Sequence, residues 1–411
     1  MTDLKVSEQQ IREVVDGLGV GGEDAKELFA AMAWSVWCEP GDGFAGLLTQ
    51  GLGPVDALSC ELDEASPVEV RSRLIDAGRD AAWIESFGDF ESGLVQARAR
   101  WQSRKALAPV VAAGDAHRQL AGSLLTPSSP LWPEQLADLK FHQPLALWLR
   151  GSVRHLGTMG VSMVGSRNAT SYGERATNEL VGALASESLS VISGGAYGID
   201  AMAHRAALAL KTPTIAVLAG GLDRLYPVGN SSLLQRIESE GLLVSEMEPG
   251  VAPSKWRFLQ RNRLIAALGV ATVVVEANWR SGAINTVTHA RDLDRPVGAV
   301  PGSIQSPTSA GCNQLIRSMK AELITTGKEL IELVGLSFDE ADQIKRAGLG
   351  QLEVRALDAI GFDNPNEREI IADSGLSVHE LTMALGNLDL DGLIERANGG
   401  WRRRRRTVVE S

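Results

Sequence analysis

The chain of 411 residues contains little cysteine, few aromatic residues and no long hydrophobic run. Its three cysteines, Cys38, Cys60 and Cys312, stand far apart without CxxC spacing, which excludes a disulfide framework and a cysteine zinc site. This low number is typical of a reducing compartment, so we expect a cytoplasmic protein. No segment reaches the roughly 18 apolar residues that span a bilayer, and the N-terminus lacks a signal-peptide core, so we expect no membrane contact.

Positive charge is also scarce over the chain as a whole. Asp and Glu number 51 against 40 Lys and Arg, which gives a formal net charge of −11. This balance excludes a general attraction to polyanions, so any nucleic-acid site must be a local patch. The positions of the arginines therefore matter more than their number.

The length predicts two or three domains, because one domain usually takes about 100 to 200 residues. Residues 1–115 have helical apolar spacing in Asp24–Trp37 and a second apolar run in Phe44–Leu58, with a Pro-Gly break between them. We predict a helical domain here, either SAM-like or helix-hairpin-helix-like. Its glycines fit a DNA-binding hairpin or plain turns equally well, and these are Gly17, Gly19, Gly51 and Gly53.

Residues 116–335 alternate short apolar runs with helical stretches, which is the pattern of an α/β domain with a parallel sheet. Ligands of such sheets bind outside the carboxyl ends of the strands, so we expect the site in the loops that follow them. The predicted strands are Val161–Val164, Ser190–Ile192, Thr214–Leu218, Leu242–Ser245, Ala271–Glu276 and Val297–Val300.

Residues 336–350 form an acidic, glycine-containing stretch that we predict to be a linker, and residues 351–411 have the pattern of a winged helix. Its expected recognition helix, Val378–Leu388, contains Glu380 and neither lysine nor arginine, which disfavours reading of duplex DNA. The five arginines from Arg402 to Arg406 fit a basic wing or a solvated tail equally well.

Two turns after predicted strands are rich in glycine and hydrogen-bonding groups. Backbone N–H groups at the start of a helix attract phosphate, and an arginine can bind it bidentately. The first turn offers Gly165, Ser166 and Arg167. The second turn could bring its backbone close to a ligand or could simply be a tight connection, and it offers Ser193, Gly194 and Gly195.

Between Glu248 and Glu276 every charged residue is a cation, and Trp256 and Phe258 lie among them. Cations can hold phosphates while rings stack on unpaired bases, so this stretch favours a nucleic-acid surface. Alternatively, the arginines form a solvated helix face and the two rings cover the core. The cations are Lys255, Arg257, Arg261 and Arg263.

A polar turn after the fifth predicted strand can cap a helix and present further donors to a phosphate. Its candidate residues are Ser281, Gly282, Asn285 and Thr286.

The strings VGSRNATSYG, SGGAYGIDAMAH, FLQRNRLIAALG and AVPGSIQSPTSAGCNQLI occur in this order within Leu131–Val334. In these blocks the chain resembles the DprA/Smf family of DNA-processing proteins. The resemblance implies an extended Rossmann-like domain that binds and protects single-stranded DNA and helps to load the RecA recombinase during natural transformation and DNA recombination. It implies no catalytic activity, and we expect neither a metal nor a cofactor.

Carried over by position, the family's DNA-binding residues correspond to the Gly165–Arg167 turn, to Lys255 and Phe258, and to the triplet Arg261, Asn262 and Arg263. The resemblance also implies a homodimer that uses the end of the Rossmann-like domain. At this end the chain has Met319-Lys320-Ala321 where the family usually has a Gly-Ala pair, so the geometry of the dimer stays open.

Two other functions stay open at this point. A nucleotide-processing enzyme of the phosphoribohydrolase type would need Asp200 or Glu246 as its catalytic carboxylate, but the chain lacks the PGGxGTxxE string of those enzymes. A duplex-DNA regulator would act through the winged helix, whose expected recognition helix is acidic.

Overall fold

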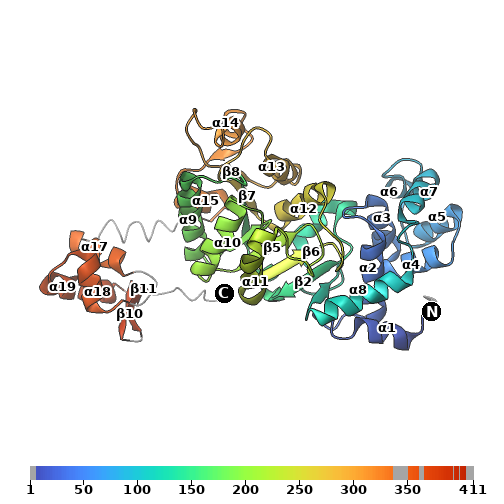
Figure 1. Ribbon diagram of the computed structural model, residues 1–411, viewed down its shortest axis with the longest axis horizontal. Helices are drawn as coiled ribbons and strands as arrows, with labels where there is room; N and C mark the ends of the chain where they lie inside the picture. The colour runs from blue at the N-terminus through green and yellow to red at the C-terminus, as the bar shows by residue number, and fades with distance from the viewer. Residues whose placement is uncertain (1–5, 337–349, 361–364, 392, 398, 404–411) are drawn as a thin grey trace. The chain divides into compact units, whose positions relative to one another are not determined.

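The computed structural model describes residues 6–336, 350–360, 365–391, 393–397 and 399–403. The chain divides into two compact units, Met1–Leu336 and Ser337–Ser411 (Figure 1). The expected linker falls almost wholly outside the described residues, as do Arg404, Arg405 and Arg406. No described helix is long and apolar enough to cross a membrane.

The first unit begins with the predicted helical region. Asp24 caps the second helix by accepting the N–H groups of Lys26 and Glu27, and Asp42 caps the third. The predicted break between them is confirmed. The helices are α1 (Glu8–Val15), α2 (Ala25–Trp37), α3 (Gly43–Leu52), α4 (Pro54–Leu62), α5 (Pro67–Asp76), α6 (Ala81–Ile84), α7 (Phe90–Trp101) and α8 (Leu107–Gln119).

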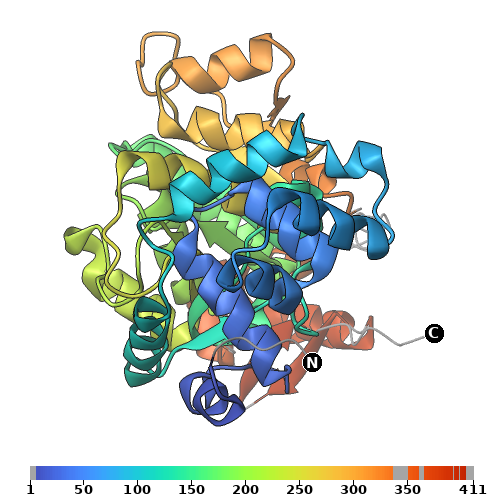
Figure 2. The ribbon, with the colours of Figure 1, turned by 90° about the vertical axis from the view of Figure 1, so that its right-hand side faces the viewer.

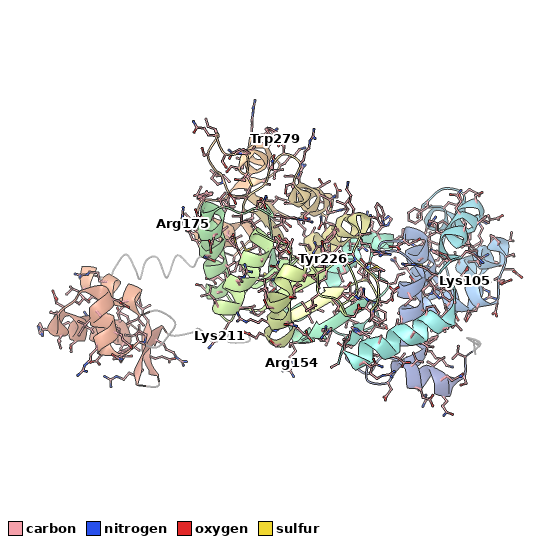
Figure 3. The ribbon with its side chains drawn as sticks, viewed as in Figure 1. Lys105, Arg154, Arg175, Lys211, Tyr226 and Trp279 are labelled. Carbon is pink, nitrogen blue, oxygen red and sulfur yellow. The ribbon has the colours of Figure 1, made fainter. Side chains whose placement is uncertain are left out.

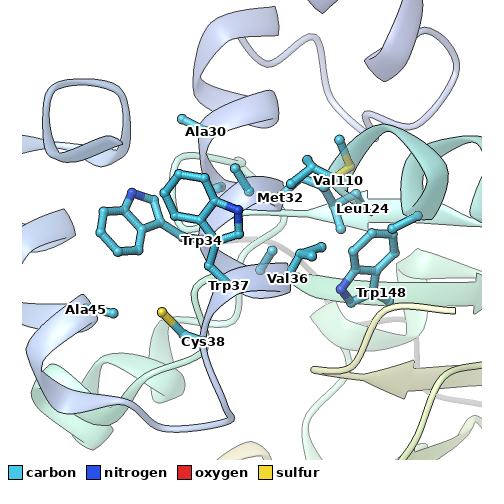
Figure 4. Packing of buried hydrophobic residues seen from close by; sticks show 14 of the residues in the cluster. Ala30, Met32, Trp34, Val36, Trp37, Cys38, Ala45, Val110, Leu124 and Trp148 are labelled. Atoms are coloured by element: carbon cyan, nitrogen blue, oxygen red, sulfur yellow. The ribbon is translucent and has the colours of Figure 1, made fainter. Parts of the chain in front are cut away.

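Buried tryptophans fill the core of these helices. The ring of Trp34 packs edge-on against Trp37 at 6.0 Å (Figure 4). It also packs edge-on against Trp101, at 5.3 Å. The same hydrophobic cluster continues to Trp148 in the sheet, whose ring lies 4.9 Å from His117. Helix α8 also crosses the boundary expected near residue 115, so the helical region and the sheet share one core.

A sheet forms the centre of this unit, in the order β1-β2-β6-β5-β4-β3-β7-β8-β9. The strands from β6 to β9 are parallel, whereas β2 pairs antiparallel with β1 and β6. The bounds are β1 (Ser123–Leu125), β2 (Leu147–Gly151), β3 (Gly160–Val164), β4 (Ser190–Ser193), β5 (Thr214–Leu218), β6 (Leu242–Ser245), β7 (Ala271–Val274), β8 (Val297–Ala299) and β9 (Glu322–Leu323).

All six predicted strands are confirmed, and β7 and β8 end slightly earlier than expected. The sequence pattern did not predict β1, β2 and β9. These three strands lie toward the two edges of the sheet, and β9 spans only Glu322–Leu323, too short for a recognisable apolar run.

Helices cover both faces of the sheet (Figure 2). In β5, Ala216 and Leu218 join the cluster of α10 and α11, while Ile215 and Val217 join the cluster of α12 and α13. This alternation makes the sheet a buried layer. The helices are η1 (Glu134–His142), η2 (Val153–Gly157), α9 (Ser171–Ser186), α10 (Ile199–Ala209), η3 (Val228–Asn230), α11 (Ser231–Glu240), α12 (Lys255–Leu268), α13 (Gly282–Asp292), α14 (Ala310–Arg317) and α15 (Gly327–Leu333).

The second unit has the predicted winged-helix pattern, with its own core around Ile370, Leu385 and Trp401. Its expected recognition helix is α19, which exposes Val378, Met383 and Leu390. The elements are α17 (Gln351–Ala359), α18 (Glu367–Ser374), α19 (Val378–Leu390) and the antiparallel pair β10 (Ile394–Ala397) and β11 (Gly400–Arg403).

Candidate nucleic-acid interface

The strand order reverses direction beside β3. The chain runs from β3 through β4 and β5 to β6, and then returns to place β7 on the other side of β3. Such a reversal opens a crevice at the carboxyl edge of the sheet. The loops after β3 and β7, which contain two groups of predicted site residues, border this crevice.

The loop after β3 holds Arg167 at the surface. The N–H of Ser166 donates to the carbonyl of Glu276 at 2.6 Å, and the N–H of Ile199 donates to the carbonyl of Ser166 at 3.1 Å. Gly198 has φ +74°, and a Cβ there would lie 2.1 Å from the Ser166 carbonyl oxygen. Three loops are therefore joined closely, and only glycine fits at position 198.

Two rings and an arginine meet at the start of α12. Ser254 caps this helix by accepting the N–H of Arg257 at 3.2 Å. The guanidinium carbon of Arg167 lies 5.4 Å from the centre of the half-buried Phe258 ring, and the ring of Tyr226 lies 5.9 Å from it. Lys255 is exposed one turn earlier. We call Arg167, Tyr226, Lys255 and Phe258 the Phe258 cluster.

Arg261 supports this cluster from inside. It is only 6% exposed, its guanidinium carbon lies 5.9 Å from the Phe258 ring centre, and its Nη1 donates to the carbonyls of Gly194 and Val217. Burial lowers the pKa of Arg261 to about 10, against the opposing effect of Asp200, so it stays cationic at neutral pH. A Cβ on Gly194 would lie 2.3 Å from this Nη1, which explains the glycine.

Arg263 is also in the interior, at 4% exposure, where its Nη2 lies 2.5 Å from Oε1 of Glu246. Burial raises the pKa of Glu246, and Arg263 opposes this rise. The interpretation of Arg261 and Arg263 as a solvated helix face is therefore wrong. Their assignment as DNA contacts stays a prediction, and their bonds to the protein favour a supporting role.

The loop after β4 uses most of its polar groups internally. The buried Ser193 hydroxyl donates to the carbonyl of Met163 at 2.6 Å, and the N–H of Gly194 donates to Asp200 at 3.2 Å. Gly195 has φ +66°, and its carbonyl accepts from the Asn230 side chain at 3.0 Å. These residues shape the loop, and their direct contact with DNA stays a prediction.

The turn before α13 divides into surface and interior residues. Ser281 caps α13, and Gly282 is exposed, with no atom within 4 Å of a Cβ built on it. Asn285 accepts from the Asn262 side chain at 3.0 Å, which ties α13 to α12. Thr286 is 2% exposed. Ser281 and Gly282 are therefore the members of this group best placed to meet a ligand.

Sequence reasoning missed two residues of this site. Glu39, from the helical region, forms an ion pair with Arg257 at 2.7 Å and another with Arg104 at 3.0 Å, so Arg257 is not a free cation. Tyr226 packs on Phe258. Tyr226 lies in the loop that follows the predicted strand Thr214–Leu218, where ligands of such sheets bind, so its position was a signal that could have found it. Nothing in the sequence links Glu39 to a residue so far along the chain.

The two carboxylates of the enzyme alternative are both buried and already bonded. Asp200 accepts the N–H groups of Gly194 and Ala196, and burial raises its pKa despite the nearby Arg261. Glu246 pairs with Arg263. Among the described residues, no group of three or more His, Cys, Asp and Glu side chains could hold a metal ion.

Comparison with known proteins identifies the family of the chain. A family model of DNA recombination-mediator protein A matches residues 123–335, and a model of the DprA winged helix domain matches residues 341–400. The chain belongs to the DprA/Smf family. A DprA protein of Mycobacterium tuberculosis is 43% identical over 300 residues, which cover 68% of this chain and 77% of the relative.

Further members of the DprA/Smf family are similar over the same region. Protein Smf of Escherichia coli is 35% identical over 296 residues, covering 69% of this chain and 78% of the relative. The X-ray structure of DNA processing protein A from Streptococcus pneumoniae superposes with a TM-score of 0.56 at 27% identity, covering 75% of this chain and 97% of that one. The predicted family, its Rossmann-like domain and its winged helix are confirmed, and the chain is a DNA-processing protein of a family of recombination mediators.

Proposed function

We propose that this protein binds single-stranded DNA at the Phe258 cluster, protects the strand and helps to load the RecA recombinase onto it. The observation that carries the proposal is the Phe258 ring, half-buried between the guanidinium group of Arg167 and the ring of Tyr226. A ring of this kind stacks on an unpaired base, while Arg167 and Lys255 bind the neighbouring phosphates. A paired base would not expose its face to Phe258.

The interior residues support the same function without touching the strand. Arg261 joins the loop after β4 to strand β5 through its two carbonyl contacts, and it places a positive charge beneath the Phe258 ring. A buried cation attracts phosphate at short range and is screened less by salt than an exposed one. Arg261 therefore favours a polyanion at this position even though its Nη1 is bonded to the protein.

A homodimer is part of this proposal. β9 is the last strand of the sheet, so its outer edge is unpaired by the described strands. Leu323, on this strand, is 50% exposed, and Met319, just before it, is 91% exposed. An exposed edge with apolar side chains is suited to a second copy of the chain. Light scattering of Met319→Asp, compared with the unaltered protein, tests this part, since loss of the dimer is the expected result.

We place this activity in the cytoplasm. The described cysteines Cys38, Cys60 and Cys312 are all free and buried, which suits a reducing compartment.

Fluorescence anisotropy of a labelled single-stranded oligonucleotide over a salt series tests the proposed binding. Unlabelled duplex of the same sequence serves as the competitor. We expect tight, salt-sensitive binding that the duplex displaces poorly. Equal or better competition by the duplex would instead assign DNA binding to a duplex-reading surface, and absence of binding at low salt would reject the proposal. Recombinase loading is then measured as the rate of RecA assembly on strands preloaded with this protein.

A further inference from the structure

The structure assigns a second base-stacking position to Trp279, reached from the Phe258 cluster by a surface path along α12 and the start of α13. This inference rests on the proposed function and extends its site to a longer stretch of single-stranded DNA. We call the path, made of Lys255, Leu259, Gly282, Trp279 and Arg280, the α12–α13 path.

The path begins on one face of α12. Lys255, Leu259 and Asn262 are spaced four and three residues apart, which places them on the same side of a helix over about 10 Å. Lys255 is exposed and Leu259 is 38% exposed. Asn262 then donates to the carbonyl of Gly282 at 3.5 Å and to Oδ1 of Asn285 at 3.0 Å. Asn262 is 8% exposed, so these bonds hold the first turn of α13 against α12 just below the surface, one turn beyond the exposed Leu259.

Trp279 stands at the far end of this path. It lies in the turn before α13, where the N–H of Ser281 donates to the carbonyl of Asn278 at 3.0 Å. Its side chain is 62% exposed, and Figure 3 labels it at the outer edge of the unit, beyond α12 from Tyr226. Trp256, in the first turn of α12, is exposed to a similar extent, at 56%, whereas Trp34 and Trp37 are buried. An exposed tryptophan ring is available for an unpaired base to stack on it.

The charge along the path fits a polyanion. From Pro249 to Arg291 the sequence contains a single carboxylate, Glu276. That carboxylate is 1% exposed and accepts hydrogen bonds from Thr170 and Thr308. Arg280, next to Trp279, is exposed. The protein as a whole has excess negative charge, but the exposed charges of this segment are all positive. This favours a partner with phosphate groups over a peptide with few acidic residues or an apolar partner.

Three features together select single-stranded DNA as the occupant. The path continues from the residues proposed to bind it, since Lys255 belongs to both. Its exposed charges are positive, and its end carries the ring that stacks best on a base. Gly282 adds open space at the start of α13, where a phosphate can approach the N–H groups of the first turn.

The test measures affinity against strand length. Anisotropy titrations use oligothymidylates of increasing length with the full chain, with Trp279→Ala and with Phe258→Ala. Val68→Ala serves as the control, since Val68 is similarly exposed, at 61%, on α5 of the helical region. We expect Trp279→Ala to leave the shortest strand unaffected and to weaken the longest by about 5- to 150-fold, the loss of one stacked base. Trp279→Phe should restore most of that affinity.

The other outcomes separate this inference from the function on which it rests. Wild-type affinity of Trp279→Ala at every length, with weakened binding by Phe258→Ala, would overturn the second stacking position alone. Unchanged binding by both variants would overturn the proposed site as well. If Trp279→Ala lost affinity for a labelled polyglutamate peptide but not for DNA, the path would belong to an acidic protein partner and the inference would be wrong. Equal thermal unfolding of Trp279→Ala and wild type checks that the fold is intact.

Discussion

Helix α12 carries arginine or lysine in both of its halves, and the two halves differ in what surrounds these cations. In Lys255–Gln260 the side chains are exposed or half-buried, and Lys255 reaches solvent. In Arg261–Leu268 every residue is buried, and Arg261 and Arg263 bond to carbonyls and to Glu246. The sequence shows one cationic helix, whereas the structure shows an exposed first turn, where we propose that DNA binds, and a second half that is buried.

The difference arises from the docking of the helical region. The turn around Gly41 lies against Arg263, and Glu39 pairs with Arg257 at the border between the two halves. These contacts bury the second half and leave the first turn at the surface. The comparison teaches that two cations about two turns apart on one helix, the exposed Lys255 and the buried Arg263, have different surroundings, so we expect the first to act in binding and the second in stability.

The largest expected effect is a loss of stability when the buried half of α12 is altered. Arg263→Ala leaves the buried Glu246 carboxylate without its partner and should lower the free energy of unfolding by about 3 to 5 kcal/mol. Denaturant unfolding measures this change. Arg236→Ala is the matched control, because its ion pair with Glu240 is exposed and should contribute less than about 1 kcal/mol. Equal effects of the two variants would contradict the anchoring role of Arg263.

The next largest effect is a loss of DNA affinity when the exposed half of α12 is altered. Phe258→Ala should weaken binding of single-stranded DNA by about 5- to 150-fold, since a stacked base contributes about 1 to 3 kcal/mol. Titration by anisotropy measures the affinity, and circular dichroism checks the fold. Phe258→Tyr keeps the ring and should bind nearly as the wild type. Unchanged affinity of Phe258→Ala would remove the ring from the site.

The buried carboxyl of Glu248 should make the stability of the protein depend on pH. Burial raises the pKa of Glu248 from 4.5 to about 6, an effect that Arg104 and Arg257 only partly offset. The folded state therefore favours the protonated carboxyl, and this contribution to stability is lost as pH rises from about 4.5 to 6. Glu248→Gln should be more stable than wild type by about 2 kcal/mol at pH 7 and equal to it at pH 4. Denaturant unfolding of both proteins at pH 7 and at pH 4 measures this difference. Equal stability of Glu248→Gln and wild type at pH 7 would contradict the raised pKa of Glu248.

The smallest effect concerns a single exposed charge. Arg167→Ala removes one phosphate contact, so the slope of log affinity against log salt should flatten by about 0.7 on single strands. The measurement is the salt series of the anisotropy assay. Arg12→Ala is a control, because Arg12 is exposed on α1 of the helical region. A slope unaltered by Arg167→Ala would assign that arginine to the structure of the loop.

Local sequence patterns predicted much of this molecule. The β-branched runs located six strands, and the glycine turns after them located the edge where Arg167 and Phe258 meet. These features depend on neighbours in the chain, so a pattern can reveal them. The family blocks added Lys255 and Phe258 as a pair.

Burial that depends on distant parts of the chain could not be predicted. Arg261 and Arg263 follow Phe258 at helical spacing, and only the placement of β5, Glu246 and Gly41 decides that they face inward. The pairing of Glu39 with Arg257 joins residues 218 positions apart. Met319 is a further case, since its φ of +52° lies in the left-handed region that favours glycine, and nothing local in the sequence signals it.

The most direct test of the account is photocrosslinking of an oligonucleotide that carries 5-iodouracil, followed by mass spectrometry of the joined peptides. If the exposed half of α12 binds DNA and the interior half only supports it, the crosslinks will form at Phe258 or Tyr226, and Phe258→Ala will remove the first of them. Crosslinks confined to the winged-helix unit, for example at Trp401, would contradict the account and move DNA binding to that unit.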